Sequence, residues 1–544
     1  MKRKRTKDRV KELSERQVDK SRLPRAVSDL LSKNNLILII AIVASSFGIR
    51  LYQLNVQGLE CEEFYTIPAA TGHHYIFFTS PPEARPTYVP VAIQEYKNLL
   101  TPDPDKSLGD VTDVLSRNVH MPLYFFLMHY WVKFAGTSEW SLRLPSVIFG
   151  TLAVMMIFLL GRELINPFVG LMSALLAAFM PDQIYFSQEA RMYSLLVLLV
   201  TSSAYAIVIT GKRPASASVY VLYALTSIAG LYTHYVYVFC FVSQVLFIWI
   251  VALLKKENLR PWLITQFSVV VASFPWFVVG LTQKQTSTDV IAWIHGSPPG
   301  GSILREIVSR ITMLISVPEA PLGWLNVAVA YTLFALGGVF LWHNRSAILL
   351  LCLWIVVPIA GIVFMDIFLK THAISVIRYW MVITPAFYLL IAAGVHKIRK
   401  PYQIPLVAVL TMCLLIAAIW TAKGQLRSKS DEHSKLGRFV DEQILDSEKE
   451  FVLTEGSNAI PLVLAYHGQR KMNILLFGWA MEKHKQQNYV EILKNGRNVV
   501  LLASGRSQAI RVLEASNYRR TAGPIRFGHI LVYRYAKTES DFNK

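Results

Sequence analysis

The chain has 544 residues, of which 53% are hydrophobic and only 17% are charged, and it carries a net charge of +19. Its mean hydropathy is +0.38. Ordinary soluble domains contain about a quarter charged residues, so this composition excludes a series of soluble domains and indicates a polytopic membrane protein. The positive charge alone leaves open a nucleic-acid partner, an anionic lipid surface or a topology signal.

The basic residues are densest in residues 1–34, which we expect to form a cytoplasmic N-terminal segment. Residues 1–33 contain 12 Lys and Arg but only 5 Asp and Glu, directly before the apolar run NLILIIAIVASSFGI. This arrangement is typical of a cytoplasmic anchor, so no nucleic-acid partner is expected. The basic stretch is too long for a signal peptide and no small-residue cleavage site follows the run, so the first apolar segment is expected to remain as a span.

Eleven apolar segments approach the roughly 20 residues that cross a bilayer. With the N-terminus inside, the inner loops read GREL, GKRP, KKENLR, HNR and KIRK, and all of them are basic, as the positive-inside rule requires. We therefore expect a multi-pass protein of the cytoplasmic (inner) membrane whose C-terminal region lies outside. The expected spans are 35–54, 144–161, 167–184, 192–211, 216–233, 235–254, 262–281, 323–342, 346–366, 378–395 and 404–421.

Two further apolar segments are interpreted as helices on the outer membrane surface. The segment HMPLYFFLMHYWVKFAG (120–136) is short, carries His129 and Lys133, and would reverse every later loop if it were a span. It lies within a long first outer loop, residues 55–143. The segment SILREIVSRITMLISV (302–317) follows the loop breaker GSPPGG and has apolar positions at helical spacing.

The composition becomes charged and polar after about residue 422. The runs EFVLTEG, NVVLLASG and HILVYRYA predict strands, and NYVEILKNG predicts a helix between them. We therefore expect residues 35–422 to form the transmembrane domain and residues 423–544 to form a small extracytoplasmic α/β domain.

Ionisable and aromatic side chains gather at the outer mouths of separate spans, whereas the span centres are nearly free of charge. Each residue alone has an ordinary alternative: a solvated loop carboxylate, an internally paired helix start in QEARMY, a turn-forming histidine in THY, or an arginine anchored at the interface. Acids, imidazoles and cations together on one face indicate acid–base chemistry on an anionic substrate. These residues are Glu62, Glu63, His120, Glu189, Arg191, His234, Tyr235 and Arg378.

The chain carries an ordered series of motifs over roughly residues 35–400. They are QGLECEEFYTI (57–67), NVHMPLYFFLMHYW (118–131), SEWSLRLPSVIFGTL (138–152), LLGREL (159–164), IYFSQEARMYSLL (184–196), LYTHYVYVF (231–239), FPWF (274–277) and IRYWMVITPAFYLLIAAGV (377–395). This series resembles the bacterial branch of glycosyltransferase family 39, within the GT-C superfamily. The branch is related to protein O-mannosyltransferases and lipid A aminoarabinose transferases.

The resemblance implies a GT-C fold and a sugar donor carried on a polyprenyl phosphate. Transfer to a hydroxyl on a lipid, glycan or protein would take place at the non-cytoplasmic face, with inversion at the anomeric carbon. The family has an Asp-Glu pair after the first span, and its Asp acts as or near the catalytic base. Here the pair aligns with Glu62 and Glu63, so Glu62 is the expected base, on a stem one methylene longer, and Glu63 is expected to orient the acceptor or support the base.

The leaving polyprenyl phosphate gains negative charge as the glycosidic bond breaks, so cations directed at it stabilise the transition state. Some relatives have a phosphate-contacting basic residue at the position of His120. We therefore expect His120, Arg191 and Arg378 to bind the donor phosphate, with an imidazole contributing best when protonated. The donor and acceptor pocket is expected to include Glu189, Tyr193, His234, Tyr235 and Tyr379.

No cofactor is required by this chemistry. A Mg²⁺ or Mn²⁺ ion among Glu62, Glu63 and Glu189 is chemically feasible because hard cations prefer oxygen ligands. The four cysteines show no metal-ligand spacing.

Two alternatives come from other functional classes. The first is a polyprenyl-lipid or solute transporter, although the sequence shows neither paired repeats nor polar residues at span centres, which are typical of transporters. The second is a catalytically silent relative that binds the carrier lipid, an alternative raised by the change from Asp to Glu at position 62.

Overall fold

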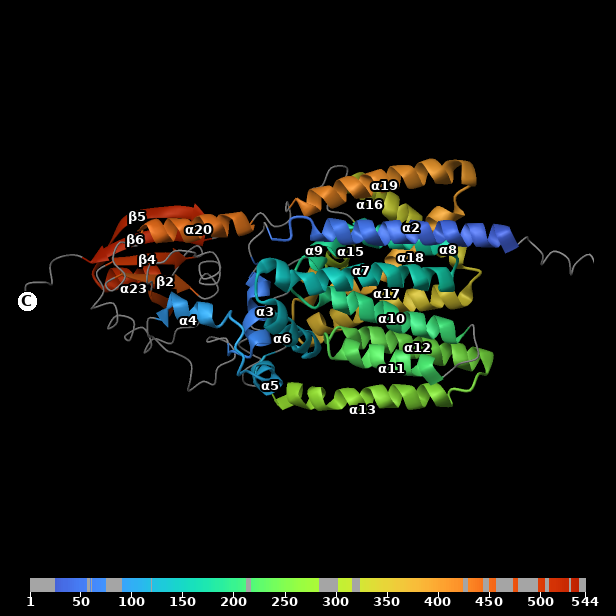
Figure 1. Ribbon diagram of the computed structural model, residues 1–544, viewed down its shortest axis with the longest axis horizontal. Helices are drawn as coiled ribbons and strands as arrows, with labels where there is room; N and C mark the ends of the chain where they lie inside the picture. Colours follow the sequence, from blue (N-terminus) through green and yellow to red (C-terminus); the bar gives the residue numbers. More distant parts are fainter. Residues whose placement is uncertain are drawn as a thin grey trace, which may run out of the picture.

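The computed structural model describes residues 25–55, 59, 61–74, 91–118, 120–211, 217–282, 302–315, 323–423, 429–443, 450–455, 473–477, 498–503, 508–527 and 530–537. A long bundle of helices carries a smaller sheet domain at one end (Figure 1). The expected N-terminal extension up to residue 24, the GSPPGG loop and the NYVEILKNG helix lie outside the described residues.

Every expected span is helical. Among the described residues, eight helices are long and apolar enough to cross a membrane, and the α8–α9 pair, bent by 59°, makes a ninth if it counts as one span. The stretches Asn35–Leu51 and Ala217–Leu231 are shorter apolar helices, so the polytopic helical architecture is confirmed while the count of eleven stays a prediction. The helices are α2 (Arg25–Leu51), α7 (Glu139–Leu164), α8 (Pro167–Phe179), α9 (Pro181–Ser187), α10 (Tyr193–Thr210), α11 (Ala217–Leu231), α12 (Tyr237–Lys255), α13 (Arg260–Thr282), α16 (Gly323–Leu341), α17 (Arg345–Phe368), η5 (Ile377–Ile383) with α18 (Thr384–Lys397), and α19 (Lys400–Ala422).

The bend between α8 and α9 is held by a buried arginine from α2. Pro181 has no N–H and cannot continue the backbone hydrogen bonding of α8, which leaves carbonyl groups near the end of that helix in need of donors. Arg50 supplies them, with Nη2 at 2.9 Å from the carbonyl of Ala177 and Nη1 at 2.7 Å from that of Ala178. Its Nε also donates to Oγ of Ser187 at 3.1 Å. Arg50 therefore fixes the orientation of α9 and the position of the loop that follows it.

Short helices cover the end of the bundle that faces the sheet domain. They include α3 (Cys61–Thr71), α5 (Leu108–Ser116), α6 (Leu123–Ala135) and α15 (Ile303–Ile315), whereas α4 (Ile93–Asn98) follows the strand β1 (Val91–Ala92) and lies beside the sheet (Figure 1). The 13-residue α6 and α15 are not among the candidate spans, in agreement with their interpretation as non-spanning helices. Figure 1 shows α3, α5 and α6 side by side there, and α3 packs against both of the others.

The C-terminal region forms a mixed α/β domain around one sheet with the order β1-β3-β2-β4-β6-β5. Strands β3, β2 and β4 are parallel, and β6 and β5 continue the sheet in antiparallel fashion. The elements are β2 (Glu450–Glu455), β3 (Asn473–Phe477), β4 (Asn498–Ala503), β5 (Tyr518–Phe527), β6 (Ile530–Lys537) and helices α20 (Lys429–Gln443) and α23 (Gln508–Ala515).

One strand of this sheet comes from the first loop and not from the C-terminal region. The two-residue β1 (Val91–Ala92) pairs antiparallel with β3, with Val91 opposite Ile474 and Ala92 opposite Asn473. The boundary predicted at residue 423 therefore describes only part of the domain, because a strand with no alternating pattern of its own completes the edge of the sheet.

Candidate active site

The segment between α2 and α7, the loop after α9, the α11–α12 turn and the start of η5 bring charged and aromatic residues together at the sheet-domain end of the bundle. Glu62 lies in the first turn of α3, and Arg191 lies in the five-residue connection from α9 to α10. Arg378 lies in η5, which leads into α18; the span that η5 and α18 form together is 94% buried over its apolar window. Arg378 thus lies at the start of the most deeply buried candidate span of the described residues.

Glu62 forms ion pairs with two arginines at once. Its Oε1 lies 3.2 Å from Nη2 of Arg378, and its Oε2 lies 3.6 Å from Nη2 of Arg191. The Glu62 side chain is 38% exposed, whereas the Arg191 side chain is 3% exposed. An accessible carboxylate beside two guanidinium groups can take a proton from a hydroxyl while the cations hold an anion.

The guanidinium of Arg191 is fixed from several sides. Nη1 donates to Oγ1 of Thr66 at 3.3 Å, and Nη2 lies 2.9 Å from Nε2 of His120. The backbone carbonyl of Arg191 accepts a hydrogen bond from Ser146 at 3.0 Å. Its Nε is buried and has no hydrogen-bond partner among the described residues, so one donor remains available for an anion.

Arg378 is positioned by a turn that Asp366 caps at the end of α17. The Asp366 carboxylate accepts hydrogen bonds from the backbone N–H of Ala373 at 2.6 Å and of Ile374 at 3.0 Å. Nε1 of Trp380 then donates to the carbonyl of Ile374 at 3.0 Å. The carboxylate therefore ties the 3₁₀ turn η4 (Ala373–Ser375), which precedes η5, to α17.

Glu63 does not face this cluster. Both of its carboxylate oxygens accept hydrogen bonds from Arg143, at 2.8 and 2.7 Å, and both side chains are 0% exposed. Oε1 also accepts from the backbone N–H of Ala190 at 2.8 Å, and Arg143 donates to the carbonyl of Leu54 at 2.7 Å. The expectation that Glu63 orients the acceptor is wrong because no substrate can reach its carboxylate, and the geometry agrees with the alternative that it supports the loop next to Glu62.

His120 is near the cluster, but its surroundings do not favour the protonated form in which an imidazole would bind a phosphate best. Its Nδ1 lies 2.8 Å from Oδ1 of Asn118, and its ring meets that of Phe125 edge to face. Burial, the positive charge of Arg191, the ring of His234 and the charge of Arg378 hold the pKa of His120 well below 6.5. The structure therefore favours a neutral imidazole at this position.

Aromatic side chains form one wall of the site. The ring of His234 packs against those of Tyr193, Tyr235 and Tyr379, with centroid distances of 5.9, 4.4 and 5.4 Å. The hydroxyl of Tyr235 donates to that of Tyr379. Burial, with the charges of Arg191 and Arg378, lowers the pKa of His234 to about 3, so this wall is uncharged at neutral pH.

Glu189 is 4% exposed and lies in the same connection as Arg191, whose N–H donates to the Glu189 carbonyl at 2.7 Å. Glu62, Glu63 and Glu189, the carboxylates suggested as ligands of a divalent ion, do not form one donor set. Glu63 is paired with Arg143, and Glu62 is paired with Arg191 and Arg378. No group of three or more His, Cys, Asp or Glu side chains suited to a metal ion occurs among the described residues.

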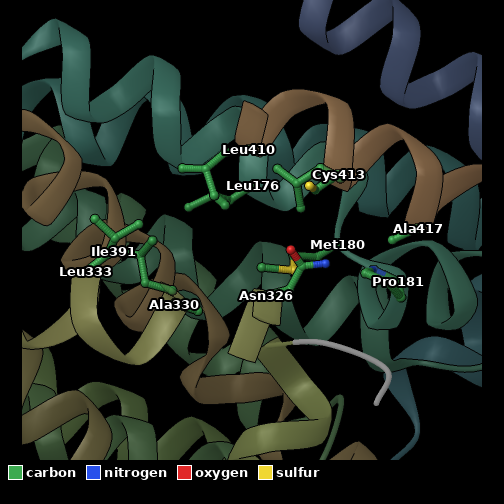
Figure 2. A pocket seen from close by; sticks show the side chains of 11 residues that line it. Leu176, Met180, Pro181, Asn326, Ala330, Leu333, Ile391, Leu410, Cys413 and Ala417 are labelled. Atoms are coloured by element: carbon green, nitrogen blue, oxygen red, sulfur yellow. The ribbon is translucent and has the colours of Figure 1, made fainter. Parts of the chain in front are cut away.

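An apolar pocket lies apart from the charged cluster, between α8, α16, α18 and α19 (Figure 2). Leu176, Leu333 and Ile391 are among its lining residues, and Asn326 presents an amide near Met180. None of the expected site residues lines this pocket, so its lining offers no acid–base chemistry.

Several residues of the site were not predicted from the sequence: Arg143, Asn118, Thr66 and Asp366. Arg143 could have been noticed as an arginine at the start of an apolar span, where an unpaired charge is costly. Thr66, Asn118 and Asp366 gave no such signal, because their roles depend on contacts between segments far apart in the chain.

Comparison with known proteins finds a family model that matches part of the chain. Residues 119–279 match the model of the dolichyl-phosphate-mannose-protein mannosyltransferase family. No curated protein sequence matches the chain. The matched region contains six of the ten expected site residues: His120, Glu189, Arg191, Tyr193, His234 and Tyr235.

Solved structures share the fold over almost the whole chain at low sequence identity. ArnT from Cupriavidus metallidurans in the apo state has a TM-score of 0.59 at 12% identity, covering 93% of this chain and 98% of that chain. The same protein bound to undecaprenyl phosphate has a TM-score of 0.58 at 12% identity, covering 92% and 97%. The apo oligosaccharyltransferase of Archaeoglobus fulgidus has a TM-score of 0.51 at 11% identity, covering 93% and 75%. The family match over residues 119–279 and the shared fold agree with the resemblance found in the motifs, and the chain has the fold of these membrane glycosyltransferases.

Proposed function

We propose that the protein transfers a sugar from a polyprenyl-phosphate carrier to a hydroxyl group of a lipid, glycan or protein at the outer face of the cytoplasmic membrane. The observation that carries this proposal is the contact of one accessible carboxylate, Glu62, with the guanidinium groups of Arg191 and Arg378. A general base and two anion-binding groups are the parts that this reaction needs.

Glu62 is the base in this mechanism. The hydroxyl oxygen of the acceptor attacks the anomeric carbon, its proton passes to the Glu62 carboxylate, and the bond from carbon to the phosphate oxygen breaks with its electron pair remaining on the phosphate. A single displacement of this kind inverts the anomeric centre. Because phosphate is a good leaving group, no second acid and no covalent intermediate are needed.

Arg191 and Arg378 bind the donor phosphate and stabilise the charge that develops on it. A guanidinium group can hold two phosphate oxygens at once, and the Nε of Arg191 is a buried donor without a partner among the described residues. The binding of undecaprenyl phosphate by ArnT, whose fold this chain shares, supports a lipid-linked donor.

The aromatic wall of Tyr193, His234, Tyr235 and Tyr379 is proposed to flank the sugar or the acceptor. These side chains are uncharged at neutral pH and lie next to Arg378 in sequence or space. Glu189 is proposed to lie near the donor, because its electrostatic interaction reaches both Arg191 and Arg378.

Mass spectrometry of lipids that co-purify with the wild type and with Glu62→Gln tests the proposal. The substitution preserves the shape of the side chain and removes the base, so a polyprenyl-phosphate sugar should be enriched in the variant, and its mass identifies the sugar. Bulk phospholipid alone in both preparations would contradict the donor assignment and favour a transporter. Equal enrichment in both would favour a silent carrier-binding protein.

A further inference from the structure

His120 connects the site to a residue with no assigned role. Its Nδ1 lies 2.8 Å from Oδ1 of Asn118, and its Nε2 lies 2.9 Å from Nη2 of Arg191. The two contacts lie on opposite nitrogens of one ring, so the imidazole joins the Asn118 amide to the guanidinium.

The partners determine which nitrogen of the ring carries the proton. A guanidinium nitrogen can only donate, so the Nε2 that faces Arg191 must present its lone pair. The proton of the neutral ring is then on Nδ1, where it donates to the Oδ1 acceptor of Asn118. Both contacts are satisfied by this one tautomer, and a doubly protonated ring would place an N–H against the N–H of Arg191.

The charged surroundings of the ring favour the same state. The groups that act on His120 are Arg191, His234 and Arg378, two of which are permanent cations. With burial they hold the pKa of His120 well below its usual range, so the ring stays neutral under ordinary conditions.

A second hydrogen-bond restraint on Arg191 comes from Thr66, in addition to the ion pair of Nη2 with Glu62 at 3.6 Å. The Oγ1 of Thr66 accepts from Nη1 at 3.3 Å, so a hydroxyl and an imidazole hold the two terminal nitrogens while Nε has no partner among the described residues. The orientation of this remaining donor depends on both restraints.

We propose that Asn118 and His120 form a neutral hydrogen-bond relay that orients the guanidinium of Arg191 toward the donor phosphate. Asn118 is then a positioning residue, and His120 acts on Arg191 and not on the phosphate itself. This inference rests on the proposed function, since it assumes that Arg191 binds the phosphate.

A pair of substitutions at one position separates the relay from direct phosphate binding. Gln can place its carbonyl oxygen near the position of Nε2 and accept from Arg191, whereas Lys replaces the acceptor by a cation. The probe is undecaprenyl phosphate, titrated into the full-length protein in nanodiscs. The relay predicts that His120→Gln binds within about threefold of the wild type and that His120→Lys binds at least about tenfold more weakly.

A second measurement uses pH. Asn118→Asp offers a carboxylate to the Nδ1–H and favours the doubly protonated ring, so affinity for undecaprenyl phosphate should fall as the pH is lowered from 8 to 5.5. The wild type should show no such fall. Because the comparison is made within one folded variant, it does not depend on how well His120→Lys folds, and the thermal unfolding midpoint of each variant is recorded beside it.

The outcomes are distinct. Strong binding by His120→Lys with weak binding by His120→Gln, or tighter binding by Asn118→Asp at low pH, would overturn the relay and assign His120 to the phosphate. Equal losses in both His120 variants would overturn it in favour of a purely structural role. If the wild type itself does not bind undecaprenyl phosphate, the proposed function fails, and the role of the relay in phosphate recognition fails with it.

Discussion

Glu62 and Arg378 are separated by 316 residues in the sequence, yet their side chains form an ion pair of 3.2 Å. The same carboxylate is 3.6 Å from Arg191. Glu62, the proposed base, is therefore paired with Arg191 and Arg378, the two arginines proposed to bind the donor phosphate. An incoming phosphate must compete with the Glu62 carboxylate for these guanidinium groups. Donor binding and release of the base are coupled by this arrangement.

Glu62→Gln should separate chemistry from binding. Loss of a general base lowers the transfer rate by about 10²- to 10⁴-fold, while removal of the competing charge should leave the affinity for undecaprenyl phosphate equal to that of the wild type or higher. Single-turnover transfer and a binding titration measure the two effects. Glu306→Gln, in the Glu306–Arg310 pair of α15, is the control, and a parallel loss of affinity in Glu62→Gln would contradict the competition.

Arg378→Lys should weaken donor binding although the charge is kept. An ammonium group cannot reproduce the planar fork of a guanidinium, so we expect the KM for the donor to rise about tenfold, with a smaller effect on kcat. Steady-state kinetics measure the split. Arg345→Lys, at the start of α17 and outside the cluster, is the matched control and should behave as the wild type.

Breaking the Glu63–Arg143 pair should destabilise the protein. Both side chains are 0% exposed, and removal of one partner from a buried ion pair costs about 3–5 kcal/mol because the remaining charge is uncompensated. Arg143→Met should therefore lower the thermal unfolding midpoint in detergent. The double variant Glu63→Leu with Arg143→Met should recover a substantial part of the loss, and a double variant as unstable as the single one would argue against the charge as the cause.

Asp366→Asn should disturb the position of Arg378 without touching substrate. The neutral amide offers one acceptor oxygen where the carboxylate accepts hydrogen bonds from Thr371, Ala373 and Ile374. We expect a rise of about fivefold in the KM for the donor, on the order of 1 kcal/mol. Asp105→Asn, at an exposed position before α5, is the control, and an unchanged KM in Asp366→Asn would show that the turn does not need the carboxylate.

His234 should make the fold sensitive to acid. The pKa of its buried ring is about 3, below the 6.5 of an unfolded chain, so the unfolded state binds the proton first and stability falls as the pH drops below 6.5. At pH 5 the loss from this residue is about 2 kcal/mol. His234→Asn keeps an acceptor for the Val236 N–H, which donates to Nδ1 at 3.2 Å. The unfolding midpoint of this variant should decline less between pH 7 and pH 5 than that of the wild type.

The sequence carries most of the information about the helices and little about the details of their ends. Apolar length predicted the long helices, because a span must be apolar over the thickness of the bilayer, and basic loops predicted their orientation. The short helices α3, α4 and α5 were not predicted individually. The break at Pro181 and its capping by Arg50 were not predicted, since hydropathy averages over a bent helix and an arginine inside a span looks like an anchor. The strand Val91–Ala92 was missed because two residues carry no periodic pattern.

The sequence predicted which residues belong to the site but not which of them contact one another. Motif order brought Glu62, Arg191 and Arg378 to one face, and the structure joins them directly. The separate roles of Glu63 and His120 could not be predicted, because both depend on partners, Arg143 and Asn118, that only the folded chain brings within hydrogen-bond distance.

The pairing of β1 with β3 has a consequence for the order in which the protein can be completed. Val91 and Ile474 lie about 380 residues apart, so the edge of the sheet cannot close until all the helices between them have been synthesised. The segment that forms β1 is therefore synthesised long before its partner strand β3. Closure of this edge links α4, and through Leu99 the end of α3 at Thr71, to the distant domain. Closure of this edge therefore adds a late link to the helix that carries Glu62, which also packs against α5 and α6.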